Sequence, residues 1–579
     1  MFKLLKNLKW IDYLFMVCVC GLVILQVWLD LKLPDYMFNI TQELEMIGYG
    51  LEVNMTSILS NGGLMLACAF GSLACAITVH FFTANISSRL GFNLRNRVYS
   101  KIQNFSLQEI NRFSTASLIT RTTNDVTQIQ MFLSMGLQAL IKAPIMAVCA
   151  VTKILNKSWQ WSISTGVAIG IMVVIVVIVV LFALPRFKKI QTLTDNINRV
   201  TRENLTGIKV VRASNAEEFQ NAKFEQCNEA ITKNNLFANR IMAIMGPGMN
   251  LIMSGMSLAI YWIGAYIVTD FAGLGNMMVF MSYSMQVVMS FIMLIMIFIL
   301  MPRALVSARR LNEVLDTKDS LAEGNYNDEL LISRGCVIFD NVSFKYPDAD
   351  EYVLKDISFV AQQGETVAFI GSTGSGKSTL INLIPRLYDA TQGRVFVDGI
   401  DVKAYNFETL NKKIGYVPQR GVLFSGTVKS NVDFGDNNAS DETIKKAISV
   451  AQASNFVSRM SDGIDSKIAQ GGTNVSGGQK QRLSIARAVA RKPEIFIFDD
   501  SFSALDYKTD RKLRLALKKH TSKATKFIVA QRIGTIKDAD KIIVLEKGQM
   551  VGIGTHEELL NTCPVYQQIA LSQLSKEEL

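Results

Sequence analysis

The stretch VAFIGSTGSGKSTLINLIPRL, residues 367–387, decides how the C-terminal part of the chain folds. Within it, GSTGSGKS (371–378) matches the pattern G-x-x-x-x-G-K-[ST] at every position. The apolar run 367–370 predicts a buried strand before the glycines, and residues 379–387 begin as a helix after them. A strand, a glycine-rich turn and a helix in this order are the context that a phosphate-binding loop requires.

The residue types of this loop suit nucleotide chemistry. Glycines let backbone N–H groups close around phosphates, and the N-terminus of the following helix adds a favourable dipole. We expect Lys377 to reach the β- and γ-phosphates and Ser378 to hold Mg²⁺. The nucleotide-binding residues predicted here are Gly371, Ser372, Thr373, Gly374, Ser375, Gly376, Lys377, Ser378 and Thr379.

A second apolar strand supplies two acidic residues. The run IFIF (495–498) is followed by Asp499, and an Asp at the end of such a strand suits a contact to Mg²⁺, usually through water. Asp500 follows, at the position where a general base or a water-orienting group could stand. The alternative for Asp500 is that its side chain caps the next turn.

The N-terminal half has a different composition. Residues 11–302 contain long uncharged runs, whereas residues 320–579 resemble an ordinary charged α/β protein. The runs reach the length of about 20 residues that a membrane helix needs, and helix is the default because lipid offers backbone groups no partner. Six spans are expected, at roughly 11–32, 57–84, 138–156, 160–184, 243–268 and 277–302.

The placement of Lys and Arg orients these spans. Connections 33–56 and 269–276 contain neither residue type, whereas connection 85–130 contains six and connection 186–240 contains ten. We therefore expect the N-terminus, the two long connections and the C-terminus on the cytoplasmic side. Because the net charge of +11 follows this topology, a nucleic-acid partner is not expected. The long connections read as helical extensions of the spans, with solvated loops as the alternative.

A third motif points to a family. The segment VSGGQKQR (475–482) lies between the phosphate-binding loop and Asp499. With these motifs, the chain resembles ABC transporters of the exporter type over essentially its whole length. The resemblance implies a multidomain half-transporter: an all-α membrane domain of six helices with long cytoplasmic extensions, followed by an α/β P-loop NTPase domain with a helical subdomain. It also implies ATP and Mg²⁺ as ligands.

The resemblance divides the chain into four parts: an N-terminal interfacial segment (1–10), a transmembrane domain (11–315), a linker (316–330) and an ATP-binding cassette domain (331–579). Within the transmembrane domain, two stretches resemble the family's cytoplasmic loops, which carry its coupling helices. These stretches are RTTNDV (121–126) and NLTGIKVVRASNAEE (204–218), with coupling helices expected around 107–114 and 214–219.

The resemblance also assigns roles outside the phosphate-binding loop. Tyr346 would stack on adenine, and Gln419 in GYVPQR (415–420) would sense Mg²⁺ and the membrane domain. SALD (503–506) corresponds to the D-loop of the family. The signature residues that would face a nucleotide are Ser476, Gly477, Gly478 and Gln479.

The signature also argues for a second copy of the domain. Glycines at the start of a helix offer backbone donors to a phosphate, but one domain cannot fold them onto its own phosphate-binding loop. Two domains arranged head to tail can do so, with ATP between them. A second half-transporter chain is therefore the expected partner.

The sequence departs from the family at the catalytic centre. Asp500 stands where the family has Glu, Gln531 stands where it has His, and Gln470 replaces Glu before the signature. Asp is one methylene shorter than Glu, Gln cannot become a cation, and misplacement by about 1 Å can cost about 100-fold in rate. Because the signature differs from the family only in Val475, the pattern predicts one half of a heterodimer, with a degenerate site on this chain's own loop. A slow homodimer that uses Asp as the base is the alternative.

The membrane domain gives weaker signals about substrate. Four Met residues recur at near-helical spacing in span six, and such surfaces suit varied apolar ligands, with packing or lipid contact as the alternative. Lys142 is expected to snorkel at the cytoplasmic interface, and Lys153 to meet an anionic group near the outer leaflet. The candidate cavity residues of span six are Tyr283, Met285, Gln286, Met289, Phe291, Met293 and Met296.

The predicted function is ATP-driven export of amphipathic or hydrophobic compounds, of the multidrug type, across the cytoplasmic membrane of a bacterium. The chain would act as one half of a heterodimer, and hydrolysis would occur mainly at the site completed by the partner's Walker motifs. A homodimeric lipid or peptide exporter is the alternative. A nucleotide-gated channel or sensor is a different class, disfavoured because no regulatory insert accompanies the two domains.

Overall fold

The structure is a computed structural model that describes residues 2–6, 8–48, 54–155, 159–268, 271–327, 334–347, 349–435 and 439–573. Residue 156 of the third expected span and residues 328–330 of the expected linker lie outside the described residues. The chain forms two compact units. The first comprises Met1–Ile102 and Ala116–Thr317, and the second comprises Gln103–Thr115 and Lys318–Leu579.

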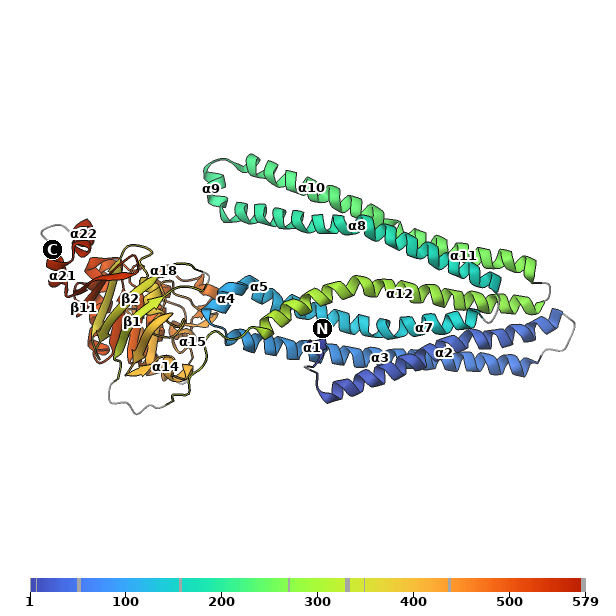
Figure 1. Ribbon diagram of the computed structural model, residues 1–579, viewed down its shortest axis with the longest axis horizontal. Coiled ribbons are helices and arrows are strands. Elements are labelled where there is room, and N and C mark those ends of the chain that lie inside the picture. Colours follow the sequence, from blue (N-terminus) through green and yellow to red (C-terminus); the bar gives the residue numbers. More distant parts are fainter. Residues whose placement is uncertain are drawn as a thin grey trace. The chain divides into compact units, whose positions relative to one another are not determined.

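The first unit consists of helices (Figure 1). Its helices are α1 (Phe2–Leu5), α2 (Trp10–Gly48), α3 (Met55–Gln103), α5 (Thr115–Thr120), α6 (Val126–Met131), α7 (Leu137–Leu155), α8 (Trp159–Thr206), α9 (Ile208–Ala213), α10 (Glu217–Ala243), α11 (Met245–Ile267) and α12 (Phe271–Asp316). Two π-helical turns, Arg121–Asp125 and Phe132–Gly136, join α5, α6 and α7 into one continuous helical stretch.

Six helical stretches among the described residues are long and apolar enough to cross a membrane. They are Trp10–Leu44, Met55–Gln103, Thr115–Leu155, Trp159–Thr206, Glu217–Ile267 and Gly273–Asp316. At about 1.5 Å per residue, a helix of about 45 residues is far longer than the roughly 30 Å hydrocarbon layer. The helices therefore continue well beyond the membrane, as the sequence predicts.

The membrane helices pack through small and apolar side chains. α12 lies against α7 and α2, and α8 runs beside α10 (Figure 1). Phe280 on α12 is fully buried and contacts Trp161 of α8, with ring centroids 5.4 Å apart. Ala150 on α7 is also fully buried in the same apolar cluster.

The turn between α8 and α10 differs from the expected coupling helix at 214–219. The short helix there is α9, Ile208–Ala213, whereas residues 214–216 form a turn and Glu217 begins α10. Gly207 precedes α9, and Asn215 has a φ of 50°, which ends the helix in the left-handed region that Asn tolerates. The short helix therefore lies just N-terminal to the predicted range 214–219, and the prediction of its position was wrong by between one and two helical turns.

The second unit is built on two sheets (Figure 1). The larger has the strand order β12-β11-β3-β10-β9-β6, and all its neighbouring strands are parallel except β11 and β12. Its strands are β3 (Thr366–Gly371), β6 (Ile414–Val417), β9 (Ile495–Asp499), β10 (Thr525–Val529), β11 (Lys541–Glu546) and β12 (Gln549–Gly554). The smaller antiparallel sheet has β1 (Val337–Phe344), β2 (Leu354–Ala361), β4 (Gln392–Val397) and β5 (Ile400–Asp401).

Helices cover this framework, and several of them form a helical subdomain between β6 and β9. The helices are α13 (Lys377–Ile381), α14 (Phe407–Lys413), α15 (Val428–Val432), α16 (Asp441–Val450), α17 (Ser454–Val457), α18 (Gly477–Ala490), α19 (Tyr507–His520), α20 (Ile533–Ile536), α21 (His556–Thr562) and α22 (Pro564–Gln573). A small ribbon of β7 (Gly426–Thr427) and β8 (Lys467–Ile468) braces the subdomain. The six-helix membrane domain and the α/β domain with a helical subdomain are thus confirmed.

One helix from the N-terminal half of the sequence belongs to the second unit. α4 (Leu107–Phe113) begins at Ser106, which forms a capping box with Glu109. Leu107 packs against the apolar core around β1 and β3, and Nδ2 of Asn111 donates to the Tyr388 hydroxyl at 3.5 Å. Glu109 accepts a hydrogen bond from the backbone of Ser320 at 3.2 Å. This helix occupies the region 107–114, where the first coupling helix is expected.

Candidate functional site

The phosphate-binding loop joins the end of β3 to the start of α13. Gly371, Gly374 and Gly376 have φ values of 154°, 83° and 95°, all positive. A Cβ atom on Gly371 would lie 2.0 Å from the carbonyl oxygen of Leu545, and one on Gly376 would lie 2.7 Å from Leu354. Only glycine fits at these two positions, because side chains there would collide with neighbouring strands. The loop thus presents backbone rather than side chains to a ligand.

Lys377 lies across this loop. Its ammonium group donates to the carbonyl oxygens of Gly371 and Ser372, at 2.9 and 2.7 Å, and to the hydroxyl of Ser375 at 3.2 Å. Burial lowers the pKa of Lys377, against the charges of Asp500 and Asp499, which raise it. The side chain is therefore a desolvated cation held ready by its own loop, which suits it to an anionic ligand.

Asp499 faces the start of α13. The Ser378 hydroxyl donates to Oδ1 of Asp499 at 2.7 Å. Burial raises the pKa of Asp499, and the neighbouring charge of Asp500 raises it further, against Ser378 and Lys377. A hydroxyl and a carboxylate oxygen beside a phosphate-binding loop are the hard oxygen donors that Mg²⁺ prefers, so these residues fit the ion.

Replacing Asp499 by Asn tests this assignment. Because burial disfavours the carboxylate, we expect the nucleotide-free protein to keep its melting temperature or to gain about 2 °C. We expect the further stabilisation by Mg²⁺ with ATP, over ATP with a chelator, to fall by more than half, since binding stabilises by mass action. Thermal unfolding of both proteins in lipid nanodiscs measures this. An undiminished Mg²⁺-dependent shift would contradict the assignment.

Asp500 lies where three chain segments meet. Oδ2 of Asp500 accepts hydrogen bonds from Nε2 of Gln531 at 2.8 Å and from Nε2 of Gln419 at 3.4 Å. The three residues follow β9, β10 and β6, which are neighbours in the larger sheet. Burial raises the pKa of Asp500, and the hydrogen bonds from Gln419 and Ser503 oppose this. The carboxylate is thus hydrogen-bonded by two side-chain amides, and an amide cannot accept a proton from it.

The carboxylate of Asp500 does not cap the next helix. Asp500 has a φ of 45°, and its backbone carbonyl accepts from the hydroxyl of Ser503 at 2.9 Å. The next helix, α19, is capped by another residue, since Oδ2 of Asp506 accepts from the backbone of Thr509 at 2.9 Å. The strained backbone and the amide contacts direct the Asp500 carboxylate toward the site.

Tyr346 lies beside the phosphate-binding loop. Its hydroxyl and that of Thr379 are 3.0 Å apart, and its ring makes edge contacts with Phe344 and Tyr388. The ring is half-buried, so part of it remains available for stacking. This position is compatible with a contact to a base whose phosphates occupy the loop.

The signature forms the N-terminus of α18. Ser476 caps the helix in a capping box with Gln479: the Ser476 backbone donates to Oε1 of Gln479 at 2.9 Å. Ser476 and Gly477 are exposed, and nothing lies within 4 Å of a Cβ added to Gly477. In the part of the chain that the structure describes, no hydrogen bond joins residues 476–479 to residues 371–378. The N-terminus of this 14-residue helix is therefore exposed, and a helix N-terminus favours the approach of an anion.

Two residues extend this picture beyond the sequence prediction. Nε2 of Gln481 donates to the carbonyl of Pro418 at 3.0 Å, which ties the signature helix to the loop that carries Gln419. Nε2 of Gln573 donates to the carbonyl of Gln531 at 2.7 Å. Gln481 lies in the segment 475–482 but has no role assigned from the sequence, and Gln573 lies outside the motifs, so only the fold reveals these two contacts. Gln470 is exposed in a short turn before the signature.

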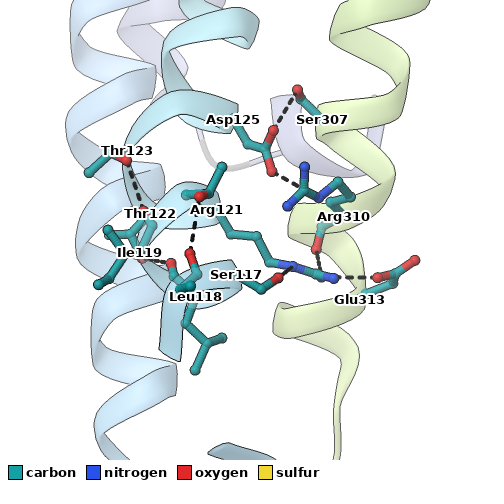
Figure 2. Close-up of polar contacts among 12 residues, drawn as sticks. Ser117, Leu118, Ile119, Arg121, Thr122, Thr123, Asp125, Ser307, Arg310 and Glu313 are labelled. Atoms are coloured by element: carbon teal, nitrogen blue, oxygen red, sulfur yellow. Dashed lines mark hydrogen bonds and ion pairs between the residues drawn. The ribbon is translucent and has the colours of Figure 1, made fainter. Parts of the chain in front are cut away.

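RTTNDV (121–126) lies on the π-helical turn between α5 and α6, where two charged side chains reach α12 (Figure 2). Arg121 donates to the carbonyl of Arg310 at 2.5 Å and to Glu313 at 2.9 Å. Asp125 accepts from the Ser307 hydroxyl at 2.9 Å and pairs with Arg310 at 3.3 Å. Arg121 and Asp125 are both buried. Two ion pairs of opposite polarity, Arg121–Glu313 and Asp125–Arg310, therefore link this helical stretch to α12.

Reversing the charges of the Asp125–Arg310 pair tests whether this ion pair stabilises the packing of these helices. Asp125→Arg places a second guanidinium beside Arg310, and we expect the melting temperature to fall by about 5 °C or more. The double variant Asp125→Arg with Arg310→Asp reverses the pair, and we expect it to recover most of the loss. Thermal unfolding in detergent measures both. A double variant as unstable as the single one would mean that the ion pair does not fasten the helices.

The structure overturns one expectation for the membrane charges. Lys142 does not snorkel, because its ammonium group turns to Oδ2 of Asp30 on α2 at 3.0 Å, and both side chains are largely buried. Lys153 does meet an anionic group, the carboxylate of Asp35 at 2.7 Å. The acidic partners were missed. The signal was available for Asp30, since it lies inside the expected span 11–32, where an acidic residue is costly and implies a partner, whereas Asp35 lies in the connection 33–56.

The Met face of α12 is divided in the structure. Met285, Gln286, Met289 and Met293 line a cavity, whereas Met296 is exposed outside it. Phe291 packs beside the apolar core of the first unit. Tyr283 is fully buried, and its hydroxyl donates to the carbonyl of Leu31 at 3.1 Å, so it is a core residue rather than a cavity residue.

Comparison with known proteins identifies two matching families and several relatives. Residues 14–291 match the family described as ABC transporter transmembrane region, and residues 354–503 match the family ABC transporter. An uncharacterized ABC transporter ATP-binding protein of Mycobacterium tuberculosis is 41% identical over 89% of both chains. An ATP-dependent lipid A-core flippase of Syntrophus aciditrophicus is 30% identical over 85% of this chain and 82% of its own.

Two further similarities are informative. A multidrug resistance ABC transporter ATP-binding and permease protein of Lactococcus lactis is 29% identical over 89% of this chain and 88% of its own. The solved structure of a bacterial Atm1-family ABC exporter with ATP bound superposes with a TM-score of 0.79, at 23% identity, over 97% and 98% of the two chains. It shows the same fold. With its membrane helices and its P-loop domain fused in one polypeptide, the chain belongs to the ABC transporter family as a half-transporter.

Proposed function

We propose that the protein is an ATP-driven exporter of amphipathic or hydrophobic compounds in the cytoplasmic membrane of a bacterium, with both termini in the cytoplasm. The main observation in support of this proposal is that α4 belongs to the nucleotide-binding unit. This helix belongs by sequence to the connection between two membrane spans, yet it packs on the nucleotide-binding unit through Leu107 and Asn111. A movement of that unit would therefore pull directly on the membrane helices.

ATP would bind at the loop 371–378. The backbone N–H groups of the loop and the Lys377 ammonium would hold the phosphates, and Tyr346 would stack on adenine. Ser378, Asp499 and Gln419 would place Mg²⁺, which neutralises charge on the phosphates. In this assignment Lys377 exchanges its bonds to loop carbonyls for bonds to phosphate oxygens.

The environment of Asp500 supports slow hydrolysis on this loop. A general base must take a proton and release it, and here the carboxylate is bonded by the amides of Gln531 and Gln419. Neither amide can accept a proton from Asp500 or become a cation near the γ-phosphate. We infer that this loop, completed by a partner's signature, binds ATP and turns it over slowly.

The signature of this chain supports a competent second site. Ser476 and Gly477 are exposed and form a well-capped helix start, so they are available to a partner's nucleotide. Rapid hydrolysis would then occur on the Walker motifs of a second, different half-transporter. A homodimeric lipid exporter is the second candidate, favoured by the 30% identity to a protein named as a lipid A-core flippase.

Transport of a dye by the reconstituted protein tests the proposal. We expect ATP-dependent uptake of an amphipathic dye by proteoliposomes whose nucleotide-binding domains face outward, and no uptake with a non-hydrolysable analogue. Both half-transporters should be present, so the chain is purified with an affinity tag from its native membrane and its companions are identified by mass spectrometry. ATP hydrolysis that drives no amphiphile across the bilayer would refute the function. A complex with only this chain would favour the homodimer.

A further inference from the structure

A cavity of about 340 Å³ lies in the membrane domain between α7, α11 and α12. This volume is within the range of small-molecule sites, about 300–1,000 Å³. Met146 of α7, Met253 of α11 and Met289 of α12 line its walls from three sides. Thioether side chains are flexible and polarizable, so the walls suit an apolar body of variable shape.

One end of the cavity is polar. Lys142 and Gln286 both line it, and both are bonded to Asp30 of α2: Lys142 to the carboxylate at 3.0 Å and Gln286 to the backbone carbonyl at 3.3 Å. Both side chains therefore line the cavity and contact the same residue of α2. The amide oxygen of Gln286 is buried and has no hydrogen-bond partner among the described residues. A buried acceptor without a donor indicates a missing ligand group or water.

The charge that this end presents is positive. Lys142 lines the cavity, whereas Asp30 is not among the described residues that line it. The other oxygen of Asp30, Oδ1, accepts from the Ser72 hydroxyl on α3, which turns the carboxylate toward a neighbouring helix. The ammonium group has three donors, of which the carboxylate uses one. An anionic group can therefore join Lys142 without displacing Asp30, and a cation would meet the ammonium first.

We propose that this cavity binds amphiphiles with an apolar chain and an acidic head group, whose carboxylate pairs with Lys142. A hydroxyl or amide N–H next to that carboxylate donates to the free oxygen of Gln286, as the N–H of an N-acyl amino acid would. This inference rests on the proposed function and narrows its substrate class from amphipathic compounds in general to acidic ones.

Photolabelling of the full transporter in nanodiscs tests the inference. The probe is N-dodecanoylglycine with a diazirine in its chain, and the labelled peptides are identified by mass spectrometry. We expect labelling of α7 and α12 around Met146 and Met289. We expect unlabelled N-dodecanoylglycine to compete about tenfold better than its methyl ester and than dodecyltrimethylammonium. The ester lacks the negative charge that would accept a charge-assisted hydrogen bond from Lys142, and the trimethylammonium compound carries the opposite charge.

Two matched double variants locate the effect. Lys142→Gln with Asp30→Asn neutralises the pair at the cavity without leaving a lone charge, and we expect a roughly tenfold loss of labelling and of the acid's advantage over its ester. Lys153→Gln with Asp35→Asn neutralises a similar pair that does not line the cavity, and we expect unchanged labelling. Thermal unfolding of both variants establishes that they are folded.

The outcomes separate this inference from the proposed function. Equal competition by the trimethylammonium compound, or unchanged labelling of the Lys142–Asp30 variant, would overturn the acidic-amphiphile site while dye transport still stands. Selective labelling together with an absence of ATP-dependent transport would uphold the site and refute the exporter function. Labelling confined to peptides outside α7, α11 and α12 would also overturn the inference.

Discussion

Replacing Ser476 by Arg is expected to lower the steady-state ATPase rate of the assembled transporter about 100-fold, whereas Lys377→Ala is expected to lower it less than tenfold. Ser476 begins the signature helix, which would complete the partner's fast site, and a bulky cation there would block its approach to the nucleotide. Lys377 belongs to the loop whose Asp500 lies among amides, so it serves the slow site.

A matched variant separates this effect from a loss of helix capping. Ser440 caps α16 in the same subdomain and accepts from the backbone of Thr443 at 3.3 Å. Ser440→Arg removes a cap of about 1 kcal/mol but lies outside the signature, so we expect a nearly unchanged rate. ATPase assays of the three variants in nanodiscs make the comparison. Equal losses from Ser476→Arg and Lys377→Ala would contradict an asymmetric transporter.

The second large effect concerns repair of the slow site. We expect Asp500→Glu with Gln531→His to raise ATP hydrolysis on this chain's loop by about 10- to 100-fold. Glu carries its carboxylate one methylene further toward the attacking water, and His supplies a group that can be charged. The amide that now donates to Asp500 at 2.8 Å is removed at the same time.

The repair is best measured where the other site is silent. In the Ser476→Arg background, the remaining turnover comes from this chain's loop and the partner's signature. Asp500→Asn with Gln531→His is the control, since it lacks the carboxylate and should show no gain. If the repaired variant hydrolyses ATP no faster than its Ser476→Arg parent, the two departures at Asp500 and Gln531 do not account for slow turnover.

Features formed by consecutive residues could be predicted from the sequence. Gly371, Gly374, Gly376 and Lys377 lie on one strand–turn–helix unit, and the spacing of these residues is enough to predict that unit. The membrane spans follow from composition in the same way. The short helix near 107–114 was expected from the family resemblance, and the structure shows a capping box of Ser106 and Glu109 at its start.

Contacts between distant residues could not be predicted from spacing, although the family resemblance assigned Gln419, Asp500 and Gln531 to the nucleotide site. Gln419 and Asp500 are 81 residues apart, and they meet only because β6, β9 and β10 are neighbours in the sheet. Lys142 and Asp30 are 112 residues apart on different helices, so the expected snorkelling of Lys142 was wrong. The second short helix was misplaced, because a left-handed Asn215 rather than a motif determines where it ends.

The most direct test of the central claim, an asymmetric ATPase completed by a different chain, is the turnover of this protein in lipid nanodiscs. The rate is measured for the chain purified alone and for the complex with the second half-transporter from its native membrane. The account predicts that the chain alone hydrolyses ATP at least about 10-fold more slowly than the complex, because both sites of a homodimer would carry Asp500 and Gln531. Robust turnover by the chain alone, equal to that of the complex, would contradict the account and show that the Asp–Gln pair is catalytically sufficient.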